Sequence, residues 1–311
     1  MKKIFNKIMV TTLALGLLLS SSFVVHADVD ELWGVPFFAY GASLSESERE
    51  QVKTTFNLSG LEEGRDFDAI HVDGNDMVYF LGRGNPNASM LSSVLIRHRD
   101  AGTGVEVSIL TPDYITRVTA TQYATAMITA GVTDALVEVA APSPVTGEAA
   151  LTGIYKAFSE RGVELDEDRM AVAQEQLEVT SSISNYHEDN DEFDSYILDQ
   201  AVVEIQGELA EHYQETGEHA TMEEIEEMVV DILQNNDLSD VLTPDQIQRL
   251  HGFADRFQLT DAINSDEFLS QLNNVGDRLG NIVRDLDINV DRGTLANWWN
   301  NVVNWFRNLF N

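Results

Sequence analysis

An α+β fold is predicted for this chain: an α/β domain with a mixed β-sheet comes first, an all-α helical region follows, and an amphipathic helix ends the chain. Three observations predict it. Up to about residue 160, short segments with strand patterns alternate with helical patterns. From Glu164 onward, apolar residues recur at helical spacing. Residues 294–311 separate into an aromatic side and an amide side when they are placed on a helix.

The first half of the chain carries both kinds of pattern. Strand patterns occupy residues 36–40, 68–72, 89–99, 104–110 and 135–140, and helical patterns occupy residues 45–56, 120–130 and 147–158. Ser45 and Glu48 have the spacing of a capping box, and Gly131 suits a left-handed helix end. The break at residues 100–103 separates two alternating segments, which predicts a β-hairpin. We therefore expect a mixed sheet in an α/β domain over residues 28–162.

The second half reads as helix almost throughout. Thr243, with Pro244 at the first helical position and Gln246 three residues after the cap, predicts a helix start. Residues 185–192 are rich in charge and are expected to form an exposed loop. We expect five or six helices in a helical domain over residues 163–293.

The N-terminus has the three parts of a secretory signal peptide. Three lysines in the first seven residues precede an apolar run over residues 8–19, which is too short for a membrane span of about 20 residues. Small residues, Val25 and Ala27, stand at the two positions that a signal peptidase reads. We expect cleavage between Ala27 and Asp28, removal of residues 1–27, and an extracytoplasmic mature protein.

The mature chain is strongly acidic. The formal net charge of the whole chain is −33, and removal of the signal peptide takes away three lysines and no acidic residue. Such a charge repels nucleic acid, so a nucleic-acid partner is excluded, whereas divalent cations or basic partners are attracted. The chain has no cysteine, which excludes disulfides and zinc–thiolate sites.

Several linked motifs in the first half resemble one family. They are Gly41–Ser45 (GASLS), Tyr114–Thr116, Tyr123–Gly131 (YATAMITAG), Ala135–Ala141 (ALVEVAA) and Gly147–Phe158 (GEAALTGIYKAF). In this order they resemble the YpuA-like proteins, which are secreted proteins of Gram-positive Firmicutes with unknown function. The resemblance implies a signal peptide, an extracytoplasmic location and an α/β-then-helical layout. It implies no catalytic residue.

The C-terminal segment 294–311 is the predicted contact surface. On a helical wheel its large apolar residues share one arc and asparagines fill the opposite face. The contact residues are Leu295, Trp298, Trp299, Val302, Trp305, Phe306, Leu309 and Phe310. Burying six such side chains corresponds to about 10 kcal/mol before ordering costs. Three environments fit this face: the protein's own helical domain, a membrane interface, or another protein, a second copy included.

A weak calcium pattern precedes this segment. Oxygen-bearing side chains recur at every second residue, as in the first half of a calcium loop. They belong to Asp285, Asp287, Asn289 and Asp291. The loop's glycine and its bidentate glutamate are replaced by Val290 and Ala296. A short extended segment with one buried face explains the run equally well.

No catalytic motif stands out: the sequence contains no HExxH, GxSxG or P-loop. The sequence therefore favours a non-enzymatic cell-envelope interaction protein without a cofactor, whose partner is an envelope protein or a membrane surface. One alternative is an envelope hydrolase that acts on carbohydrate through acidic residues. The other is a calcium-responsive extracellular module.

Overall fold

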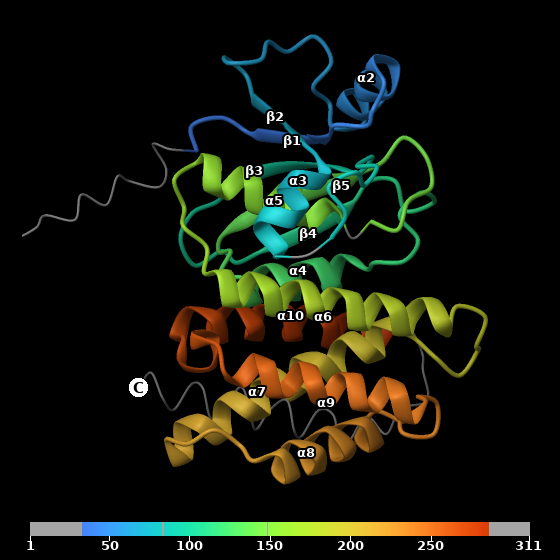
Figure 1. The fold of residues 1–311 in the computed structure, drawn as a ribbon, viewed down its shortest axis with the longest axis vertical. Helices are drawn as coiled ribbons and strands as arrows, with labels where there is room; N and C mark the ends of the chain where they lie inside the picture. Colours follow the sequence, from blue (N-terminus) through green and yellow to red (C-terminus); the bar gives the residue numbers. More distant parts are fainter. Residues whose placement is uncertain (1–32, 83, 148, 286–311) are drawn as a thin grey trace, which may run out of the picture.

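A computed structural model describes residues 33–82, 84–147 and 149–285 of the chain (Figure 1). The strands of the described residues are β1 (Phe37–Gly41), β2 (Asp68–Val72), β3 (Ser93–His98), β4 (Glu106–Ile109) and β5 (Ala135–Ala140). The helices are α2 (Glu46–Thr55), α3 (Gly74–Leu81), α4 (Ala120–Thr129), α5 (Ala149–Glu160), α6 (Glu167–Tyr186), α7 (Ser195–Thr216), α8 (Met222–Asn235), α9 (Pro244–Gln258) and α10 (Asp266–Asp285), with a short 3₁₀ turn at Asp261–Asn264. The predicted α+β layout, with a mixed sheet and helices in the first half and a largely helical second half, is confirmed.

The five strands form one mixed sheet in the order β2-β1-β3-β5-β4. Strand β1 runs parallel to β2 and antiparallel to β3. Strand β5 runs antiparallel to β3 and parallel to β4. The mixed sheet expected from the alternating patterns is therefore present, and β2 and β4 are its edge strands.

The predicted hairpin between β3 and β4 is wrong. Strand β5 lies between them and pairs with both. Asp134, just before β5, fixes this arrangement because its carbonyl accepts from the N–H of Arg99 at 2.7 Å and its carboxylate accepts from the N–H of Gly104 at 2.8 Å. The turn at residues 100–103 reverses the chain direction, but the two strands that it joins are not neighbours.

The sheet is covered on both faces. Side chains alternate between the two faces along each strand. On one face Phe38 and Leu95 pack with Val52 of helix α2 and with Phe56, the residue that caps its end, in a small apolar cluster. The other face contributes to a large cluster that continues through the helices. In Figure 1, α4 lies below the sheet, followed by α6 and α10, then α7 and α9, with α8 at the lower end.

Helix α4 is the centre of this arrangement. Nine of its ten residues are buried, because it lies between the sheet and the helical layers and contacts β4, α6, α7 and α10. Thr119 caps it through a capping box with Gln122. The motif YATAMITAG thus forms the helix that joins the two halves, and Gly131 follows it with a φ of +90°, as expected.

The helix caps that the sequence predicted are present, and one helix was missed. Ser45 and Thr243 each form a capping box. The acidic run after β2 was interpreted only as a strand end, but Asp73 caps α3 by accepting from the N–H groups of Asn75 at 2.7 Å and Asp76 at 3.1 Å. Within the described part of the chain, no helix has the length and apolar character required to cross a membrane.

Candidate functional site at the junction of the sheet and the helical layers

Nearly all of the residues that the sequence singled out lie outside the described part of the chain. This applies to the cleavage site at Ala27 and Asp28, to the contact residues between 295 and 310, and to Asp287, Asn289 and Asp291. Asp285 is the last residue of α10. Among residues 33–82, 84–147 and 149–285, no group of three or more metal-binding side chains comes together. The calcium pattern thus stays a prediction.

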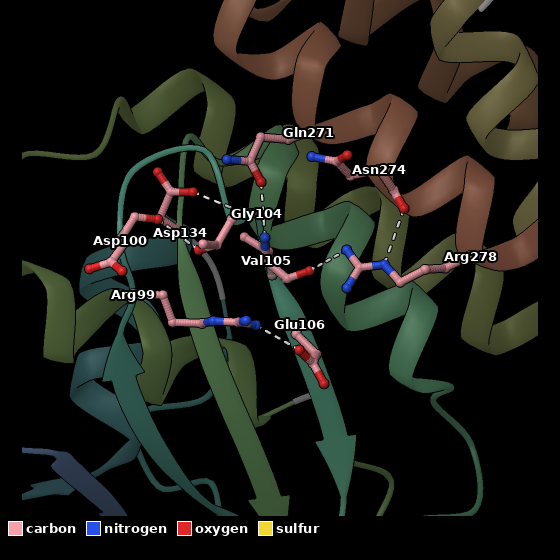
Figure 2. Close-up of polar contacts among 10 residues, drawn as sticks. Arg99, Asp100, Gly104, Val105, Glu106, Asp134, Gln271, Asn274 and Arg278 are labelled. Carbon is pink, nitrogen blue, oxygen red and sulfur yellow. Dashed lines mark hydrogen bonds and ion pairs between the residues drawn. The ribbon is translucent and has the colours of Figure 1, made fainter.

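Helix α10, which ends just before residues 286–311, is hydrogen-bonded to the edge of the sheet (Figure 2). Gln271 accepts from the N–H of Val105 at 2.9 Å, and Arg278 donates to the carbonyl of Val105 at 2.5 Å. Gln271 and Arg278 are two helical turns apart and so share one face of α10. Burial lowers the pKa of Arg278, while the Glu106 carboxylate opposes that effect. Val105, the residue just before β4, therefore gains backbone partners from a helix.

The loop before β4 is shaped for this contact (Figure 2). Gly104 has a φ of +77°, and a Cβ atom at this position would lie 3.3 Å from the side-chain atoms of both Gln271 and Asn274. Arg99 and Glu106 form an ion pair at 2.6 Å across the loop. A glycine here allows α10 to approach the loop closely, so the helix, the loop and the start of β4 form one unit.

Two carboxyl groups of helix α7, those of Asp199 and Glu204, are buried. The hydroxyl of Thr119 donates to Asp199 at 2.6 Å, and the amide of Asn236 donates to Glu204 at 2.7 Å. Burial raises the pKa of Asp199 to about 7, and it raises the pKa of Glu204 to about 7 as well. No lysine, arginine or histidine of the described residues forms an ion pair with either. Both acids therefore take up protons near neutral pH.

A buried amide–hydroxyl network lies between α4, α6 and α7. Thr129 donates to Gln176 at 2.8 Å and accepts from Gln206 at 2.9 Å. Nearer to Asp199, Gln122 donates to Ser184 at 3.2 Å. Such a network fixes helix register, because each displaced member would leave a buried polar group unpaired. Its one signal in the sequence is a set of threonines at a helical spacing of four in α4, which did not predict a network.

A pocket of about 320 Å³ opens beside this network, at the start of α7. Its lining includes Thr119, Ser184, His187 and Tyr196. His187 is buried, although the sequence placed it in an exposed loop. Its Nε2 lies 3.0 Å from an oxygen of Gln246 that already accepts a backbone N–H, so Nε2 carries the hydrogen. A hydrogen bond from His187 thus connects the end of α6 to the start of α9.

Comparison with known proteins places the chain in a family. Residues 40–275 match the family described as "Protein of unknown function (DUF1002)", and the chain belongs to this family. It is also similar to the protein described as "Uncharacterized protein YpuA" from Bacillus subtilis (strain 168), with 27% identity over 278 residues, which are 87% of this chain and 86% of that protein. The resemblance to YpuA-like proteins is thereby confirmed. No solved structure matches the chain.

Proposed function

We propose that the protein is exported, that cleavage after Ala27 releases its mature form, and that it acts outside the cytoplasm as a non-enzymatic interaction protein of the cell envelope. The contact would be made by residues 294–311. The observation that carries this proposal is the division of that segment into a face with three of the chain's four tryptophans and a face of asparagines.

The anchoring of α10 supports this role for the segment. Gln271 and Arg278 connect the helix to the backbone of Val105, just before strand β4 of the sheet. Only eight residues, 286–293, separate the end of α10 from the contact segment. An attachment made by residues 294–311 would thus act on a helix that is joined to the body of the protein, and through it on the whole molecule.

The hydrolase alternative needs two carboxylates that converge in an open cleft, one of them with a raised pKa. Asp199 and Glu204 have raised pKa values, but both are enclosed between helices. The pocket between α6 and α9 has several acids, including Glu175, which is paired with Arg256. Neither Asp199 nor Glu204 lines that pocket. The geometry therefore favours binding over hydrolysis as the proposal.

Deleting residues 294–311 tests the proposal. The mature protein and the shortened chain are compared in the envelope fraction and in the culture medium. We expect the shortened chain to move to the medium. The thermal unfolding midpoint of the shortened chain should equal that of the mature protein. Loss of thermal stability with unchanged partitioning would instead mean that the segment packs on its own protein. Unchanged partitioning, mass and stability together would contradict a contact role for the segment.

A further inference from the structure

The outer edge of β2 presents backbone groups that β1 does not use. The N–H of Asp68 donates to the carbonyl of Pro36 at 2.9 Å, and the carbonyl of Val72 accepts a backbone N–H from the end of β1 at 2.8 Å. In a parallel pair, alternate residues of a strand point their backbone groups to the same side. The even-numbered residues of β2 therefore face β1. Ala69 and His71 direct their N–H and C=O groups away from the sheet.

One of these outward groups shows that the edge accepts hydrogen bonds from outside the sheet. The Nζ of Lys156, on helix α5, donates to the carbonyl of His71 at 2.9 Å and to the carboxylate of Asp76 at 2.8 Å. The remaining outward groups are the N–H of His71 and both backbone groups of Ala69. These three groups point away from β1, and no backbone hydrogen bond within the described residues reaches them from the outer side.

An open groove of about 530 Å³ lies along this edge. Its lining residues are Phe37, Glu63, Gly64, Asp68, Ala69, Ile70, Glu160 and Arg161. The loop before β2 forms one side of the groove and the end of α5 forms the other. The groove thus exposes the strand edge where Ala69 offers its N–H and C=O, which is the geometry that strand addition needs.

The charges in the groove favour a basic ligand. Arg161 is already engaged: it donates to Asp68 at 2.7 Å and lies over the ring of Phe37, with its guanidinium carbon 4.8 Å from the ring centre. The carboxylates of Glu63 and Glu160 are on exposed residues on either side of the groove. The whole chain adds a net charge of −33. A cationic side chain is therefore attracted here both locally and at long range.

The opposite edge of the sheet differs at its start. At β4, α10 already occupies both outward groups of Val105 through Gln271 and Arg278. A helix thus protects the start of that edge strand, whereas β2 borders a groove. The groove beside β2 therefore makes that edge the better candidate for a partner.

We propose that the groove along β2 binds an extended basic peptide segment, which adds to the sheet as a sixth strand next to β2 and places a lysine or arginine side chain between Glu63 and Glu160. The groove includes none of residues 294–311, and this proposal does not depend on the proposed envelope contact. The backbone of Ala69 and His71 would provide affinity for any extended segment, and the two glutamates would select the basic one.

A labelled seven-residue peptide of alternating lysine and threonine is the probe, and fluorescence anisotropy with the mature full chain is the measurement. We expect saturable binding at about 0.15 M salt. The same peptide with every backbone N–H methylated keeps its charge but loses its donors, so its affinity should fall at least about tenfold. Equal binding of the two peptides, or no binding of the parent peptide up to about 1 mM, would overturn strand addition.

Protein variants locate the site. The double variant Glu63→Gln and Glu160→Gln should bind the parent peptide about tenfold more weakly, because two favourable charge contacts are removed. The matched pair Glu223→Gln and Glu227→Gln, on the exposed side of distant α8, changes the net charge equally and should leave binding within about twofold. Equal losses in the two pairs would mean that only the overall charge attracts the peptide, and would overturn the assignment.

A backbone variant completes the test. His71→Pro removes one outward N–H of β2, and proline is tolerated on an edge strand when its nitrogen faces away from the partner strand. We expect weaker peptide binding with an unchanged far-UV spectrum. Unchanged affinity in a folded variant would contradict the proposal. The chain without residues 294–311 should bind the peptide as the full chain does, so failure of the groove and failure of the envelope contact are distinguishable.

Discussion

Replacing Asp199 with asparagine tests whether α7 holds a protonated carboxyl group in the protein interior. Burial raises the pKa of Asp199 to about 7, whereas an aspartate in an unfolded chain titrates at about 3.9. Between these two values the folded protein keeps a proton that the unfolded chain has released. The free energy of unfolding therefore falls as the pH rises through this window, and the fall ends above the folded-state pKa.

The size of the effect follows from the width of the window. Between about pH 5 and about pH 8, roughly two pH units lie inside the window between the unfolded-state and folded-state pKa values of Asp199. Each unit changes the free energy of unfolding by about 1.4 kcal/mol. Asp199 thus lowers the free energy of unfolding by about 3 kcal/mol over this range. Asp199→Asn keeps an acceptor for the Thr119 hydroxyl but has no proton to lose. Glu204 is present in both proteins and cancels in the comparison.

Urea unfolding followed by circular dichroism between about pH 5 and about pH 8 measures the effect. The free energy of unfolding of the natural protein should fall with pH about 3 kcal/mol further than that of Asp199→Asn. Asp231→Asn, on the exposed side of α8, removes the same charge in solvent and should keep the slope of the natural protein. Parallel curves for the natural protein and Asp199→Asn would refute a buried, protonated Asp199.

Three further predictions concern the contact of α10 with Val105, two glycines and calcium. Gln271→Ala leaves the N–H of Val105 without its acceptor and should lower the free energy of unfolding by about 1–3 kcal/mol, whereas Ser270→Ala on the exposed side of α10 should change it by less than about 0.5 kcal/mol. A Cβ atom at Gly41 would lie 2.1 Å from a backbone oxygen, so Gly41→Ala should lower the free energy of unfolding. A Cβ atom at Gly207 meets nothing within 4 Å, so Gly207→Ala should raise that free energy by about 0.5–1 kcal/mol, and urea unfolding measures both changes. If residues 285–291 bind calcium, the thermal midpoint rises in calcium relative to chelator; identical melting curves would remove the calcium-responsive alternative.

The sequence predicted those parts of the fold that depend on local chemistry. Strand β5 has the bounds expected from its alternating pattern, because one face of it packs in the large cluster. The starts of α2 and α9 were predicted because Ser45 and Thr243 satisfy helix N–H groups within three residues. These signals need no knowledge of distant parts of the chain.

What depends on distant contacts was not predictable. The turn at residues 100–103 shows that the chain reverses, but not that β5 inserts between the two strands. Asp73 resembled the end of a strand because an acidic residue both terminates strands and caps helices. Asp199 resembled an ordinary helical acid, since its burial arises from α4, which precedes it by about 80 residues. The open edge of β2 likewise became visible only with the strand order.

The fraction of the mature chain that stays with the cell envelope tests the central claim most directly. Trp298→Ala with Trp305→Ala removes two indoles from the aromatic face, and Asn297→Ala with Asn304→Ala alters the opposite face to the same extent. The proposed contact predicts that the tryptophan pair releases the protein into the medium and that the asparagine pair leaves it with the envelope. Equal retention of both variants, at the level of the natural protein, would contradict it.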